Sequence, residues 1–139
     1  MIDSREVVTA QVYAGSQCAD MFALVSVRID PAQLAQVVSR RPFAYVVTAS
    51  NADRPHLRAV VVSPVGEWFV IRVGSQTANN VDRTHGLTLL WPPLPPAEFR
   101  EQFDDHSVIA DCEATTEMID DSFQVRARPT TAVWHRPAR

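Results

Sequence analysis

The sequence predicts an all-β protein with short helices, built as an antiparallel barrel. Short runs of β-branched and aromatic residues recur along the chain, and clusters of glycine, proline, asparagine and aspartate separate them. Six or seven such runs follow one another at short intervals, accompanied by two short helical patterns. This spacing is typical of an antiparallel barrel and differs from the alternation of strand and helix in βαβ folds.

Composition bounds the class of protein. The chain has 139 residues, 46% hydrophobic and 21% charged, which suits one domain with a core of its own. Its net charge of −3 gives no general reason to expect nucleic acid or a membrane as a partner. The N-terminus has early acidic residues and no apolar run typical of a secretion signal, so a cytoplasmic location is expected. Cys18 and Cys112 form no C-x-x-C pair, and free thiols are expected in that compartment.

The first confident element is a helix. Residues 1–25 lack a clean hydrophobic period and are interpreted as an N-terminal extension that need not be ordered, followed by a domain over residues 26–139. Asp30 suits a helix N-cap, and Pro31 suits the first helical position. Apolar residues then recur at i, i+3 and i+4, which predicts a short amphipathic helix over residues 31–39.

Strands are predicted where β-branched and aromatic residues cluster. These segments are 43–49, 56–63, 68–73, 87–91, 107–115, 123–128 and 131–135. A tight hairpin turn is expected at residues 64–67, and the prolines of 92–96 require an extended loop. Residues 117–122 are predicted to form a turn or a short helix, and Pro129 is predicted to interrupt the closing strand.

Candidate binding chemistry is concentrated where the second and third predicted strands lead into a second helix. Ser75 or Thr77 is the predicted N-cap of this helix. Gly74 lets the backbone approach a ligand, hydroxyl and free N–H groups at a helix start bind anions, and Arg58 or Arg72 would neutralise their charge. The stretch fits either a phosphate cradle for a nucleotide-like cofactor or an ordinary hairpin followed by a capped helix.

Five segments occur in a distinctive order along the chain. They are PFAYVVT at 42–48, RPHLRAV at 54–60, VGS at 73–75 with Thr77, Asn79 and Asn80, LTLLW at 87–91, and AVWHRP at 132–137. As an ordered set they resemble the FMN-binding split-barrel proteins, the pyridoxamine 5′-phosphate oxidase-like family. The resemblance implies a six-stranded antiparallel split barrel that forms a homodimer. It also implies two sites between the subunits for FMN, a deazaflavin coenzyme being the alternative occupant.

The resemblance also implies which residues hold the cofactor phosphate. They are an arginine of the second strand, the end of the third strand and the helix that follows, which in this chain are Arg58, Val60, Gly74, Ser75, Thr77 and Asn79. Relatives commonly carry a lysine at the position of Asn79, and this chain has no lysine nearby. The implied activity is that of an oxidoreductase of unknown substrate. A dimer that has lost or weakened the cofactor is the alternative, and haem binding is a weaker one.

Other candidate groups have simpler interpretations. The four histidines are dispersed and do not predict a metal site. His56 shares a strand face with Arg58, so it either contacts the ligand or is a surface or hydrogen-bonded histidine. The run Asp104-Asp105-His106-Ser107 contains the residue types of a catalytic triad, but the absence of a G-x-S-x-G motif favours a solvated loop. No catalytic acid or base is assigned, because a hydride can pass between a flavin and its substrate without one.

Overall fold

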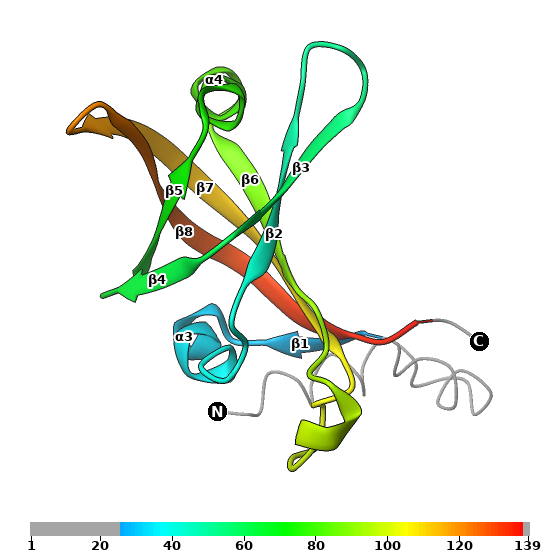
Figure 1. Cartoon of the computed structure of the whole chain (residues 1–139). Coiled ribbons are helices and arrows are strands. Elements are labelled where there is room, and N and C mark those ends of the chain that lie inside the picture. The colour runs from blue at the N-terminus through cyan, green and yellow to red at the C-terminus, as the bar shows by residue number, and fades with distance from the viewer. Residues whose placement is uncertain (1–25, 138–139) are drawn as a thin grey trace.

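A single curled antiparallel sheet forms the body of the protein. The computed structural model describes residues 26–137, so the predicted extension 1–25 and Cys18 lie outside the described residues. The strands are β1 (Ser26–Ile29), β2 (Ala44–Ala49), β3 (Pro55–Val60), β4 (Val62–Val65), β5 (Trp68–Val73), β6 (Gly86–Trp91), β7 (Ser107–Ile119) and β8 (Ser122–His135). The helices are η2 (Pro31–Gln33), α3 (Leu34–Val37), α4 (Ser75–Thr84) and η3 (Pro96–Glu98). Figure 1 shows α4 and α3 at opposite ends of the curled sheet.

The strand order explains how the sheet closes on itself. It runs β3-β2-β6-β7-β8-β5-β4, with β1 added against β8. β3 and β4 therefore occupy opposite edges, although Val61 alone separates them in the chain (Figure 1). Curling brings the two edges close enough for one bend to join them, as closure of a sheet into a barrel requires.

The predicted strand over residues 56–63 is wrong as a single element. It breaks at Val61, because the first part pairs with β2 and the second part pairs with β5. The break lies within three consecutive valines, Val60 to Val62, which all have high strand propensity, so the sequence gives no local signal of the change in pairing partner. Together with the unpredicted β1, this break raises the strand number of the all-β, antiparallel fold from the implied six to eight. The predicted strand over residues 68–73 is confirmed with its bounds.

The β7–β8 hairpin is longer than predicted. Its turn consists only of Asp120 and Asp121, whose φ angles of 49° and 66° suit the tight turns that join two long strands. The turn or helix predicted over residues 117–122 is therefore wrong at its start, which continues β7. Pro129 does not interrupt β8 as predicted. It lies opposite Cys112 at a shift of register, where the missing N–H of proline is tolerated.

The first helical segment begins as predicted. The backbone N–H of Ala32 donates to the Asp30 carboxylate at 3.0 Å, and Pro31 occupies the first helical position. The segment opens as the 3₁₀-helix η2 and continues as α3, with Leu34 fully buried. Burial of that apolar side chain fixes α3 against one end of the sheet.

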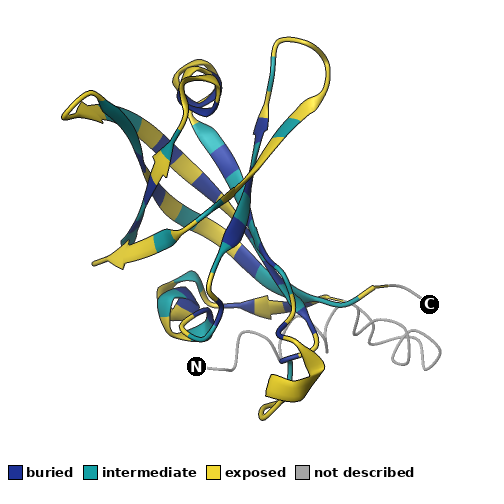
Figure 2. Cartoon of the chain, in the orientation of Figure 1, coloured by how far each residue is buried: buried dark blue, intermediate teal, exposed yellow. Residues whose placement is uncertain are grey.

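The core fills the inside of the curled sheet. Figure 2 shows buried and exposed residues alternating along the strands, as expected where one face of a sheet is buried. The largest fully buried aliphatic side chains come from seven different elements and are Leu34, Val46, Ile71, Val81, Leu89, Val108 and Val125. Cys112 belongs to this core as a free cysteine, and burial raises the pKa of its thiol to about 12, which keeps it unreactive. Within residues 26–137 no helix combines the length and apolar character needed to cross a bilayer.

Candidate functional site

A cavity lies where β3, β5, the start of α4 and the β7–β8 turn meet. Its volume is about 770 Å³, within the range of small-molecule sites in proteins. Its lining residues are His56, Arg58, Ala59, Val60, Arg72, Val73, Gly74, Ser75, Gln76, Thr77, Asp121, Ser122 and Phe123. We call this space the α4 cavity. It is the place where the residues singled out from the sequence come together.

Five of the six residues implied to hold a phosphate line the α4 cavity, namely Arg58, Val60, Gly74, Ser75 and Thr77. The sixth, Asn79, is exposed and does not line it. Successive helical residues are about 100° apart, so Asn79 lies on the side of α4 opposite to the buried Thr77. The next residue, Asn80, is buried and donates to the Thr48 hydroxyl at 3.0 Å, so it fixes α4 to β2.

The start of α4 is left without a side-chain cap. The helix begins at Ser75 with Gly74 as the N-cap, which corrects the prediction of Ser75 or Thr77. Gly74 has extended backbone angles (φ −82°, ψ 175°), and a Cβ placed on it would have no heavy atom within 4 Å. The first N–H groups of a helix carry partial positive charge and seek acceptors. An uncapped helix start beside open space is thus a potential anion-binding site.

Two arginines bring positive charge to the same cavity. Arg58 comes from β3 and Arg72 from β5, and both side chains are exposed. Within residues 26–137, the Arg58 side chain donates only to the carbonyl oxygen of the neighbouring Leu57, at 2.8 Å. In the same range the Arg72 side chain has no hydrogen-bond or ion-pair partner. All 13 basic side chains of this protein are arginines, the side chain that binds phosphate through two parallel N–H donors.

Sequence reasoning left the role of His56 open, and the structure places it in the α4 cavity. His56 Nε2 lies 3.1 Å from Thr77 Oγ1, and Thr77 is only 2% exposed. Burial, and next the charge of Arg58, lower the pKa of His56 below its ordinary value. The signal available in the sequence was the alternation that puts His56, Arg58 and Val60 on one strand face.

The β7–β8 turn contributes residues to the cavity that sequence reasoning missed. Asp121, Ser122 and Phe123 reach it because β8 pairs with β5, with Phe123 opposite Val73. This pairing joins segments about 50 residues apart, and local sequence patterns carry no signal for it. Asp121 is the one carboxylate among the lining residues.

Comparison with known proteins gives relatives in sequence and in fold. No family model matches the chain. Uncharacterised proteins from Mycobacterium bovis and from Mycobacterium tuberculosis are each 29% identical to it over 121 residues, which cover 80% of this chain and 82% of theirs. These relatives carry no described function, so they inform neither the activity nor the ligand.

Three solved structures share the architecture. A candidate pyridoxamine 5′-phosphate oxidase from Listeria innocua has a TM-score of 0.58 at 10% identity, over 75% of this chain and 96% of that one. The haem storage protein of Vibrio cholerae has a TM-score of 0.57 at 12% identity, over 80% and 96%. The FAD-binding protein of Mycobacterium smegmatis has a TM-score of 0.55 at 16% identity, over 80% and 99%. The fold is the split barrel of the pyridoxamine 5′-phosphate oxidase-like proteins. The split-barrel fold that the sequence resemblance implied is confirmed.

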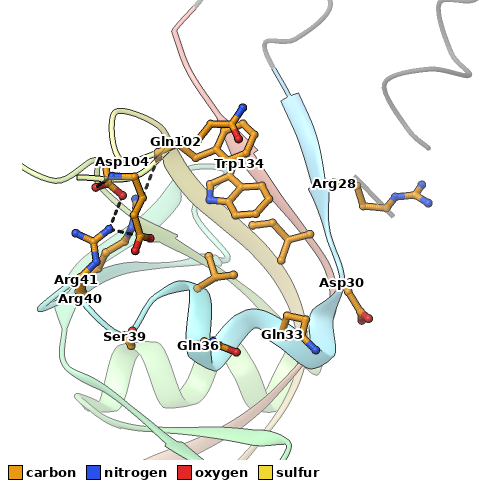
Figure 3. A pocket seen from close by; sticks show the side chains of 14 residues that line it. Arg28, Asp30, Gln33, Gln36, Ser39, Arg40, Arg41, Gln102, Asp104 and Trp134 are labelled. Atoms are coloured by element: carbon orange, nitrogen blue, oxygen red, sulfur yellow. Dashed lines mark hydrogen bonds and ion pairs between the residues drawn. The ribbon is translucent and has the colours of Figure 1, made fainter. Parts of the chain in front are cut away.

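A second cavity of this split barrel lies at the other end, beside α3, and has a volume of about 460 Å³ (Figure 3). Two of its three arginines, Arg40 and Arg41, are held by the protein itself. The Arg40 guanidinium forms an ion pair with Asp104 at 2.5 Å, as Figure 3 shows. Arg41 is buried and donates to the carbonyl oxygens of Pro92 at 3.1 Å, Phe103 at 3.2 Å and His106 at 2.6 Å. These cations stabilise the split barrel and leave little capacity for an anionic ligand.

The acidic segment 99–105 forms one wall of this second cavity. Asp104 accepts the backbone N–H groups of Arg100 and Glu101 at 2.8 and 2.9 Å. Burial opposes ionisation of Asp104, but these two bonds and Arg40 outweigh it and lower the pKa to about 2. Asp105 instead bonds to His106 Nδ1 at 2.7 Å. The triad-like run of the sequence is thus a set of structural contacts. The predicted solvated loop is wrong about solvation, because Asp104 and His106 are buried.

Proposed function

We propose that this split barrel binds the phosphate of a flavin-type cofactor, FMN or a deazaflavin coenzyme, in the α4 cavity and acts as an oxidoreductase. The proposal rests on the hydrogen-bond donors that meet in the α4 cavity. Two guanidinium groups, two hydroxyl groups and an uncapped helix start meet in one cavity of about 770 Å³. Such a set is complementary to a phosphate and has no comparable partner within the described part of the chain.

Each residue has a part in the proposed site. Arg58 and Arg72 supply positive charge, Ser75 and Thr77 supply hydroxyl donors, and the first N–H groups of α4 complete the set. The open space at Gly74 admits a phosphate close to the backbone. The cofactor, when bound, supplies hydride chemistry, and the protein supplies binding and orientation. The FAD-binding protein of Mycobacterium smegmatis, which has the same fold, supports a flavin as the class of cofactor.

An absorbance spectrum of the purified protein, followed by titration with FMN and with the deazaflavin coenzyme, tests this proposal. We expect saturable binding of one of them at about micromolar Kd, equivalent to about −8 kcal/mol. Binding of neither would overturn the proposal.

We propose further that the protein is a homodimer with its cofactor sites between the subunits. Three aliphatic side chains on the β3–β4 segment are exposed: Leu57 by 49%, Val61 by 70% and Val65 by 56%. β3 is also an edge strand with four of its six residues exposed. An edge strand of this kind is normally covered, because otherwise it promotes aggregation. A second copy of the chain would cover it and would also wall the open side of the α4 cavity.

Sedimentation of the Val61→Glu variant tests the dimer. A buried charge at this position of an interface would produce monomers and weaken FMN binding with them. Phe99→Glu is the matched control, because Phe99 is 44% exposed in the segment at the α3 end of the split barrel, away from the α4 cavity. A wild-type protein that sediments as a monomer would contradict the proposal.

Two observations favour a second candidate, a dimer that has lost or weakened its cofactor. Asn79 replaces the usual lysine, and the Asp121 carboxylate lines the cavity. Loss of one charge-assisted contact costs about 1.5–3 kcal/mol of interaction, or roughly ten- to hundredfold in affinity. A colourless protein that stays free of flavin after incubation would favour this candidate. The haem storage protein with the same fold makes haem a third probe, and a Soret band would reveal it.

A further inference from the structure

The proposed phosphate site contains a group that titrates near neutral pH. His56 on β3 is bonded to Thr77 on α4, with 3.1 Å between Nε2 and Oγ1. The cavity places both residues beside Arg58 and Arg72. Imidazole has an ordinary pKa near 6.5, so its charge can change within the physiological range.

The direction of this hydrogen bond depends on the tautomer and the protonation state of His56, and the coupling uses the tautomer with its neutral proton on Nδ1. A neutral imidazole with its proton on Nδ1 accepts the Thr77 hydroxyl proton at Nε2, so that proton is not available to a ligand. A protonated imidazole donates from Nε2, and Thr77 Oγ1 becomes the acceptor. The hydroxyl proton is then free to point into the cavity. Protonation of His56 thus adds a positive charge and releases a donor at once.

We propose that phosphate binding in the α4 cavity is coupled to protonation of His56, which acts through the Thr77 hydroxyl and compensates for the missing lysine. This inference rests on the proposed function. His56 is a positioning residue here, because it acts through the Thr77 hydroxyl to which it is bonded. The chain has no lysine at all, so no ammonium group can supply positive charge to the phosphate. A histidine that becomes protonated on binding supplies this charge instead.

The charges around His56 set the pH range of the coupling. Burial and the neighbouring Arg58 lower the pKa of His56 in the free protein, and Arg72 on β5 adds positive charge to the cavity. Asp121 on the β7–β8 turn is the opposing negative group. A dianionic phosphate in the cavity would raise the pKa of His56. The contribution of His56 to affinity is therefore complete below its free pKa and is lost as the pH rises through its bound pKa.

The test is the Kd of FMN measured between pH 6.5 and pH 8.5, beside that of riboflavin, which lacks the phosphate. A phosphate monoester has its second pKa near 6, so free FMN remains mostly dianionic over this range. Each unit by which binding raises the pKa of His56 corresponds to about tenfold in affinity. We expect FMN to bind at least about tenfold more weakly at pH 8.5 than at pH 6.5, and riboflavin to bind equally at both.

Single substitutions show which residues produce the pH dependence of FMN affinity. His56→Gln keeps a hydrogen-bonding side chain but cannot titrate, so its FMN affinity should lose the pH dependence. Thr77→Ser keeps the hydroxyl and should keep the dependence, whereas Thr77→Val should reduce it to the part that comes from the charge of His56 alone. His85→Asn is the matched control: His85 caps the opposite end of α4 at φ 62°, a backbone conformation that asparagine tolerates, and its pH dependence should equal that of the wild type.

Calorimetry of the wild-type protein tests the coupling without any variant. FMN titrations at pH 7.5 in two phosphate-free buffers of different ionisation enthalpy give the number of protons taken up. We expect uptake of about half a proton or more with FMN and none with riboflavin. FMN binding with no proton uptake, or an unchanged pH dependence in His56→Gln, would overturn the inference and leave the proposed function intact. Absence of FMN binding at every pH would refute both.

Discussion

Two pairs of arginines lie at opposite ends of this split barrel and have different roles. Beside α3, Arg41 is buried with three carbonyl oxygens around it, and Arg40 is paired with Asp104. Beside α4, Arg58 donates only to its neighbour's carbonyl, and Arg72 has no partner within residues 26–137. The guanidinium group is the same at both ends, so the difference lies in the oxygen atoms that the fold supplies.

The difference separates a structural cation from a binding cation. A buried guanidinium must be satisfied by the chain itself, because an unpaired buried charge is expensive. An exposed guanidinium keeps its donors for another molecule, and here it does so beside an uncapped helix start. Removing charge at the α3 end should therefore cost stability, and removing it at the α4 end should cost affinity.

Arg41→Ala should produce the largest effect, on stability. The substitution leaves the carbonyl oxygens of Pro92, Phe103 and His106 without this donor inside the protein, so we expect a loss of about 3–4 kcal/mol. Urea unfolding measures it. The FMN affinity of the folded fraction should not change, and a loss below about 1 kcal/mol would contradict the structural role of Arg41.

Arg58→Ala combined with Thr77→Ala should lower FMN affinity by about a hundredfold, because a charge-assisted contact and a hydroxyl donor are both lost. Stability should fall by about 1–2 kcal/mol, nearly all of it from the buried Thr77, whose bond to His56 is lost, since Arg58 is exposed. Arg28→Ala is the matched control, an exposed arginine that lines the other cavity. Unchanged affinity in the double variant would exclude the α4 cavity as the phosphate site.

Acid should weaken the α3 end first. The pKa of Asp104 is lowered to about 2 in the folded protein, so its carboxylate stabilises the fold above its ordinary pKa of 3.8. This contribution is lost as the pH falls from about 4 toward 2, and partial screening limits it to roughly 1–2 kcal/mol. Chemical denaturation at several pH values measures it. Asp104→Asn should remove this part of the pH dependence, and an unchanged acid limb would refute the assignment.

Asp121→Asn should give the smallest effect and the opposite sign. It removes the one carboxylate of the α4 cavity, so FMN affinity should rise about two- to threefold at low salt and less at high salt. Asparagine accepts the φ of 66° at this position, so the turn is preserved. Weaker FMN binding in this variant would mean that Asp121 helps to hold the ligand.

Local chemistry predicted the parts of the fold that depend on near neighbours. The strand over residues 68–73 and the Asp30 cap each depend on a few adjacent residues, and both were predicted correctly. The break at Val61 and the survival of β8 through Pro129 depend on which strand lies alongside. Those pairings join distant segments, and a single sequence does not display them.

The same distinction applies to the candidate site. Alternation along β3 placed Arg58 and Val60 on one face, and both line the α4 cavity. Asn79 was carried over by resemblance alone, and the helical turn directs it to solvent. Asp121 and Phe123 enter through the pairing of β8 with β5, which only the folded chain reveals.

The pairing of β1 with β8 has a consequence for synthesis of the protein. Ser26 lies opposite His135, and the two are separated by 109 positions in the chain. At a translation rate of about 5–20 residues per second, β8 is completed roughly 5–20 s after β1 has been synthesised. Strands β2 to β6 can begin to pair on the ribosome, but the α3 end closes only after His135 has emerged. The first strand of this split barrel is therefore among the last to be placed.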